Sequence, residues 1–121
     1  MAALLKSPHM ELASECIIEF LGTGLLAFTV ACSAGQGASL AGFAIGSTLM
    51  CAIYAGGHLS GANYNPAVSL ALFLTGNMDA QKMGIYMATQ VVGGICASLT
   101  YPESVTEGVD AGTSWYLEVD S

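Results

Sequence analysis

The sequence predicts an all-α membrane protein with three transmembrane helices and one re-entrant half-helix. Of its 121 residues, 54% are hydrophobic and 9% are charged, whereas ordinary soluble domains carry roughly 25% charged residues. From Phe20 to Met78 the chain has no Asp, Glu, Lys or Arg, yet a polar, glycine-rich loop interrupts this run. In hydrocarbon, irregular chain is tolerated only where it is buried in protein or lines a wet cavity. The loop is therefore expected to line a solute pathway.

Charge and cysteine usage exclude several classes of function. The net charge is −7, but most of the acidic residues lie in 102–121, beyond the predicted spans, and only two residues are basic. Nucleic-acid binding is therefore not expected. The four cysteines occur singly in apolar runs, without the paired spacing of a metal site, so neither a metal nor a cofactor is predicted. No nucleophile, base and orienting group fall together, so an enzyme is not predicted.

The first predicted span covers residues 13–34 and follows a leader at 1–12. Glu15 and Glu19 lie four residues apart and share one helix face. Glu19 lies a turn deeper, where a carboxylate is costly and normally faces a bundle interior with partners. Glu19 is therefore predicted to brace the structure or to line the pathway. The alternative is a protonated or interfacial residue at a helix end.

Two further spans are predicted at 38–56 and 83–101. The tight connection at 35–37 makes the first two spans antiparallel neighbours. Gly42 and Gly46 have the spacing that lets membrane helices approach closely. Residues 102–121 are acidic and rich in Gly, Ser and Thr, which predicts an extramembrane tail.

Between the spans at 38–56 and 83–101, residues 57–75 are predicted to form a loop and a half-helix. Asn65 is a favoured N-cap, and Pro66 suits the first helical position because its missing N–H has no intrahelical partner there. A helix from Pro66 to Thr75 is about 15 Å long, half of the roughly 30 Å hydrocarbon core. Such a segment enters the membrane without crossing it.

The positive-inside rule orients the chain. Lys6 and Lys82 are the two basic residues, and with three spans both fall on one side. That side is expected to be cytoplasmic, with the N-terminus on it and the acidic tail on the opposite side.

The motifs resemble those of one known family. The run from His58 to Val68 resembles the first signature loop of the aquaporins, the major intrinsic proteins. Glu19-Phe-Leu-Gly-Thr resembles their first-span element, and Gln90-x-x-Gly resembles their third-span motif. The resemblance covers residues 12–101. Family members have two inverted repeats, a second Asn-Pro-Ala loop and a selectivity arginine, whereas this chain has one repeat and no arginine. The resemblance therefore implies half of an aquaporin-like inverted-repeat fold.

The resemblance also implies roles for residues of the loop. The side-chain amide of Asn65 would meet solute at mid-membrane, and Pro66 and Ala67 complete its motif. The carbonyl groups of three preceding residues would accept hydrogen bonds from solute: Gly61, Ala62 and Asn63.

The resemblance singles out four further positions. Ile45 matches the span-two position of the selectivity constriction, although simple packing is the alternative. His58 would line the cytoplasmic mouth, with a structural or interfacial role as the alternative. Glu19 and Gln90 would brace the loops by hydrogen bonds.

The sequence therefore predicts half of a passive channel in a lipid bilayer, for water or a small neutral solute. A single half-helix supplies one wall of a pore, so conduction is expected to need a complementary second repeat or a homo-oligomer. The alternative is a non-conducting, truncated membrane protein that associates with full-length relatives and modulates their assembly.

Overall fold

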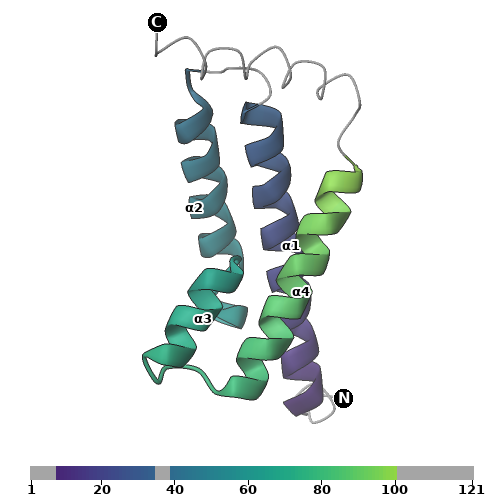
Figure 1. The fold of residues 1–121 in the computed structure, drawn as a ribbon, viewed down its shortest axis with the longest axis vertical. Coiled ribbons are helices and arrows are strands. Elements are labelled where there is room, and N and C mark those ends of the chain that lie inside the picture. Colours follow the sequence, from purple (N-terminus) through teal and green to yellow (C-terminus); the bar gives the residue numbers. More distant parts are fainter. Residues whose placement is uncertain (1–7, 35–38, 101–121) are drawn as a thin grey trace, which may run out of the picture.

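The structure, a computed structural model, describes residues 8–34 and 39–100, and this part of the chain is all-helical. It contains α1 (Pro8–Ala34), α2 (Ala41–Ser60), α3 (Pro66–Leu74) and α4 (Ala80–Leu99). Helix α1 packs against both α2 and α4, and the short α3 packs against α4. Figure 1 shows α1 and α4 running in the same general direction, with α2 antiparallel to them. The antiparallel arrangement of the first two helices is as predicted.

Helix α1 begins earlier than the predicted span. It starts at Pro8, so residues 8–12, assigned to a leader, are helical. Proline is tolerated in the first turn, because the N–H groups there have no intrahelical partner, and Glu11 in that turn complements the positive end of the helix dipole. The rest of the predicted leader lies outside the described residues, as does Lys6, on which the predicted orientation partly rests.

Helix α2 ends later than predicted. The predicted loop begins at Gly57, but α2 continues through Ser60. Gly61 then adopts a left-handed conformation, with φ of 89°, and its N–H donates to the carbonyl of Gly57 over 3.0 Å. Glycine is the usual residue at such a helix end because it has no Cβ to clash. The irregular loop is therefore Gly61–Asn65, and the predicted connection at 35–37 lies outside the described residues.

Helix α3 begins at Pro66, as predicted, and ends at Leu74 with Thr75 as its cap. Gly76 has φ of 75°, and the N–H of Asn77 donates to the carbonyl of Leu72 over 2.8 Å, which closes the helix end. Asp79 caps α4 by accepting from the backbone N–H of Lys82 over 2.9 Å. The predicted end of the third span and the acidic tail, at 101–121, lie outside the described residues.

Among the described residues, the helices approach one another closely at Gly93, and not at Gly42 and Gly46. No described atom lies within 4 Å of a Cβ built at Gly42 or Gly46, so the predicted close approach there is not seen. A Cβ on Gly93 of α4 would instead lie 2.6 Å from the backbone oxygen of Phe20 on α1. Helices α1 and α4 therefore touch backbone to backbone at this crossing.

The buried interior of the described residues is small and largely polar. Five polar side chains are buried, and large apolar side chains lie on the outside, among them Leu21, Phe43 and Leu99. The buried polar residues are Glu19, Ser60, Asn63, Ser69 and Gln90. Of the described chain, Met10–Ser33 and Ala41–Ser60 are long and apolar enough to cross a membrane; α4 is not among these candidates.

Candidate functional site: the loop between α2 and α3

Glu19 of α1 is the centre of the site. Its side chain is fully buried. Oε1 accepts hydrogen bonds from the Ser60 hydroxyl at 2.7 Å and from the Asn63 backbone N–H at 2.9 Å. Oε2 accepts from the Tyr64 backbone N–H at 2.7 Å and from Gln90 Nε2 at 2.8 Å. One carboxylate thus ties the end of α2, the loop and α4 to α1. It also brings together Glu19 and Gln90, each of which was predicted to brace the loop.

The loop reaches Glu19 because its backbone takes a left-handed course. Ala62 and Tyr64 have φ of 53° and 51°. Residues other than glycine seldom adopt this conformation, which costs about 1–3 kcal/mol at each position where it occurs. The hydrogen bonds from two loop N–H groups to a buried carboxylate offset that cost, because bonds to charged groups are the stronger kind.

A second cluster joins α3 to the loop and to α4. Asn63 Nδ2 donates to Ser69 Oγ over 3.1 Å, and Gln90 Nε2 lies 3.0 Å from the same oxygen. Asn63, Ser69 and Gln90 are all buried. The side chain of Asn63 therefore points into the protein and holds α3, whereas only its carbonyl group was assigned a role from the sequence.

Asn65 caps α3 and presents a free amide. Its backbone is extended, and its Oδ1 accepts from the Ala67 N–H over 2.8 Å, with Pro66 between them at the first helical position. The residue is exposed. Among the residues that the structure describes, no acceptor lies within hydrogen-bonding distance of its Nδ2. The amide nitrogen is thus available to an external group, next to the partial positive charge of a helix N-terminus.

Three loop carbonyl groups are also available. Within residues 8–34 and 39–100, no donor contacts the carbonyl oxygen of Gly61, Ala62 or Asn63. The carbonyl of Ser60, one residue earlier, differs: it accepts from the Tyr86 hydroxyl over 2.8 Å. The chain thus offers a run of consecutive acceptors that ends at the Asn65 donor.

The structure does not bring Ile45 and His58 into this cluster. Ile45 lies in the second turn of α2 and is half-buried. At 1.5 Å per residue it is about 22 Å along the helix from Ser60, where the loop begins. His58 is exposed in the last turn of α2.

A polar groove opens beside the loop. It has a volume of about 540 Å³ and lies between Gly61 and Asn63 on one side and the α3–α4 connection, with Asn77 and Asp79, on the other. Lys82 borders it as well. This groove gives the loop an approach from one end of the helices.

Lys82 also forms an ion pair beside this groove. Its Nζ lies 2.9 Å from Glu15 Oε2 and 5.2 Å from the ring centre of Tyr86. The Tyr86 hydroxyl lies 3.1 Å from the same carboxylate oxygen, besides its contact with Ser60. The first half of α4 is thereby linked to α1 through Glu15 and to the end of α2 through Ser60.

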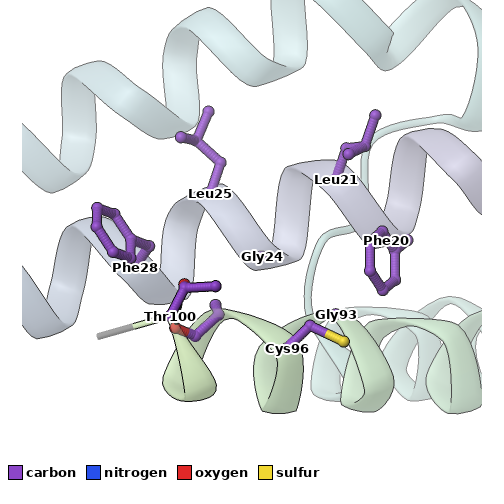
Figure 2. A pocket seen from close by; sticks show the side chains of 9 residues that line it. Phe20, Leu21, Gly24, Leu25, Phe28, Gly93, Cys96 and Thr100 are labelled. Carbon is purple, nitrogen blue, oxygen red and sulfur yellow. Dashed lines mark hydrogen bonds between the residues drawn. The ribbon is translucent and has the colours of Figure 1, made fainter. Parts of the chain in front are cut away.

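A separate apolar groove of about 490 Å³ lies between α1 and α4. Figure 2 shows it lined by Leu21 and Leu25 from α1, by Cys96 from α4 and by Thr100, which follows that helix. It shares no residue with the loop. Within the described chain, no three His, Cys, Asp or Glu side chains gather as a metal site would require.

Sequence reasoning missed four residues of the site, namely Ser60, Tyr64, Ser69 and Tyr86. The two serines are short polar side chains inside an uncharged run, and such side chains tend to find buried partners. That signal could have found them. The tyrosines carry no comparable signal, because tyrosine is also enriched at the membrane–water interface, so its presence does not indicate a buried site.

The chain was compared with known proteins, and the result agrees with the family resemblance of its sequence motifs. Residues 6–116 match the family model described as major intrinsic protein. The chain belongs to the major intrinsic protein family. As a member, it is an integral membrane protein, and the all-helical architecture fits that assignment.

Relatives within the major intrinsic protein family carry two kinds of name. The chain is 39% identical over 100 residues to a glycerol uptake facilitator protein of Pseudomonas aeruginosa, covering 76% of this chain and 36% of that protein. It is 35% identical over 116 residues to aquaporin Z of Photorhabdus laumondii, covering 93% of this chain and 50% of that protein. It is 38% identical over 96 residues to human aquaporin-10, covering 72% and 32%. The chain thus spans half or less of the length of these relatives. No solved structure matches it.

Proposed function

We propose that this chain supplies one half of a membrane channel through which water or a small neutral solute passes passively. The observation that carries the proposal is the loop Gly61–Asn65, which Glu19 fixes by hydrogen bonds. Three of its carbonyl groups and the Asn65 amide nitrogen have no partner among the described residues. Acceptors in a row followed by a donor suit a neutral molecule that exchanges hydrogen bonds as it moves. A charged solute would lose more hydration than these groups replace.

The electrostatics of α3 favour the same solute class. The N-terminus of a helix carries about half a positive charge, and here it lies directly behind Asn65. At the centre of a pore this potential opposes cations. The proposed passage is therefore for neutral molecules, and the names of the relatives point to water or glycerol.

In this proposal α1, α2 and α4 cross the bilayer, and α3 enters it as a re-entrant half-helix. Nine residues give α3 a length of about 14 Å, half of a roughly 30 Å hydrocarbon core. The N-terminus then faces the cytoplasm and the acidic tail the opposite side. Ile45 would contribute to a constriction at one level and His58 to the cytoplasmic mouth, with Glu19 and Gln90 as braces.

A complete pore requires a second wall. One half-helix supplies half of the central field, so the other half must come from a complementary second repeat or from another subunit of a homo-oligomer. The polar groove beside Gly61 and Asn63 is then the entrance on the side of Lys82.

Stopped-flow measurements on vesicles test the proposal. Vesicles of the chain, and vesicles that also hold a separately produced second repeat of aquaporin Z, are compared with empty vesicles under osmotic and glycerol gradients. We expect permeability above the empty vesicles in at least the second case. Asn65→Asp should reduce it, since the amide donor is lost, whereas Gln81→Glu adds the same charge at an exposed position and should not. Permeability equal to that of empty vesicles in both cases would contradict the proposal.

A second candidate is a non-conducting protein that associates with full-length relatives and alters their assembly. The observation that favours it is the set of very exposed apolar side chains on α2 and α3, with Phe43 76%, Tyr54 81% and Leu74 72% exposed. Co-expression with a full-length relative separates the two functions. If the second function is right, the chain crosslinks to the relative and changes its oligomer size, but adds no permeability of its own.

A further inference from the structure

The side chain of Tyr64, the residue before Asn65, is buried between two helices. It is only 3% exposed and is inserted between α1 and α2. A Cβ on Gly22 of α1 would overlap the Tyr64 ring, and a Cβ on Gly56 of α2 would overlap its hydroxyl group. The ring therefore fits there because both helices have glycine at that level.

The hydroxyl group of Tyr64 is also anchored. It donates to the carbonyl oxygen of Ala52 on α2 over 2.8 Å. The Tyr64 backbone N–H donates to Glu19 on α1 over 2.7 Å. The two ends of one residue thus bind two different helices, which fixes both the position of the peptide unit before Asn65 and its rotation.

The backbone of Tyr64 explains why such an anchor is needed. Its φ of 51° is a left-handed value that a non-glycine residue adopts only when surrounding contacts enforce it. Without the ring contacts, the extended conformation at this residue would be favoured. A change of φ there would turn Asn65, together with the start of α3 that it caps, relative to the part of the loop bound to Glu19. The amide of Asn65 would then point in another direction.

We propose that Tyr64 is a positioning residue of the loop: its ring, held between Gly22 and Gly56, sets the direction in which Asn65 presents its amide. The proposal rests on the proposed function only in taking that amide as the group that meets solute. The anchoring itself is a separate physical claim and can be measured without any transport.

Amide hydrogen exchange in lipid nanodiscs measures the anchoring. The Asn63 N–H reports the bond to Glu19, and the Ala67 N–H reports the Asn65 cap. We expect Tyr64→Leu to accelerate exchange at both amides by about tenfold or more, since local opening frees them. Tyr64→Phe keeps the ring and should give a smaller acceleration. Tyr54→Leu removes an exposed tyrosine from α2 and is the matched control, with no expected change.

Size complementarity tests whether the ring acts through Gly22. Gly22→Ala should displace the ring and accelerate the same two amides, whereas Gly42→Ala on α2, where no described atom lies within 4 Å, should not. Combining Gly22→Ala with Tyr64→Leu should be no worse than Tyr64→Leu alone, because the leucine variant has already vacated the space. Additive effects of the two substitutions would overturn the proposal.

Comparing hydrogen exchange with vesicle permeability tests the role of Tyr64 separately from the proposed channel function. Exchange in Tyr64→Leu and Tyr64→Phe equal to the unsubstituted chain overturns the positioning role, whatever the permeability. Accelerated exchange at Asn63 and Ala67, with exchange in the middle of α4 unchanged, supports it. If the loop opens in this way while vesicle permeability stays constant, the proposed channel fails and the anchoring stands. If Tyr64→Leu unfolds the whole chain, Tyr64→Phe decides.

Discussion

Gln90 and Glu19 are separated by 71 positions in the chain, and Gln90 Nε2 donates to Glu19 Oε2 over 2.8 Å. Both side chains are buried. The same amide nitrogen lies 3.0 Å from Ser69 Oγ on α3. This pair therefore joins α1 and α4 at the level of the loop, and the loop takes its shape from donors that converge on one carboxylate.

Glu19→Gln should destabilise the protein. In the glutamine, an NH2 group replaces one of the two carboxylate oxygens, and all four groups around these oxygens are hydrogen-bond donors. At least one N–H group of Asn63, Tyr64 or Gln90 therefore loses its acceptor. We expect the free energy of unfolding to fall by about 3 kcal/mol, as for a buried hydrogen-bonded charge that is removed. Unfolding with SDS in mixed micelles measures this. Glu11→Gln, at an exposed position, is the control and should change it by less than about 0.5 kcal/mol.

Ser69→Ala should weaken the attachment of α3. The hydroxyl group is the acceptor for Asn63 Nδ2, which would be left buried without a partner. We expect a loss of about 1–3 kcal/mol in the free energy of unfolding. Ser98→Ala removes an exposed hydroxyl that bonds only to the carbonyl of Ile95 in its own helix. Equal losses in the two variants would show that the buried cluster adds no stability.

Local chemistry made the start of α3 predictable. Asn65 and Pro66 carry the cap and the first-turn preference in their own side chains, so the helix begins where the sequence places it. The bracing roles of Glu19 and Gln90 were implied by the family resemblance, but their contact with each other was not predicted. Spacing along the chain could not supply it, because their distance in space depends on how α1 and α4 cross.

The end of α2 and the partners of the helix glycines could not be predicted in the same way. The loop was predicted to begin at Gly57, but α2 continues through Ser60, and the Tyr64 ring packs against it at Gly56. Gly42 and Gly46 have the spacing of a packing motif but meet no described atom within 4 Å. A glycine permits close approach without saying which neighbour makes it, so only the tertiary structure distinguishes these positions.

Gly93→Ala should separate α1 from α4. The added Cβ would lie 2.6 Å from the backbone oxygen of Phe20, and neither backbone can give way without moving its helix. We expect a loss of about 1–3 kcal/mol, the usual cost of overpacking. The neighbouring Gly94 has no described atom within 4 Å of a Cβ, so Gly94→Ala should instead raise stability by up to about 1 kcal/mol through helix propensity. Unfolding of the two variants in the same micelles gives the comparison, and a stable Gly93→Ala chain would contradict the backbone contact.

Substitutions at Asn65 should separate its structural role from its proposed contact with solute. Its Oδ1 caps α3 by accepting from the Ala67 N–H over 2.8 Å, while its Nδ2 is free among the described residues. Asn65→Ala removes both groups and should lower the free energy of unfolding by about 1 kcal/mol, the usual value of an N-cap. Asn65→Asp keeps the acceptor and adds a negative charge at the positive end of α3, which is worth about 0.3–1 kcal/mol in the stabilising direction. We therefore expect Asn65→Asp to be at least as stable as the unsubstituted chain and yet to conduct less. If Asn65→Asp loses as much stability as Asn65→Ala, the side-chain oxygen is not the cap, and the direction assigned to the amide is wrong.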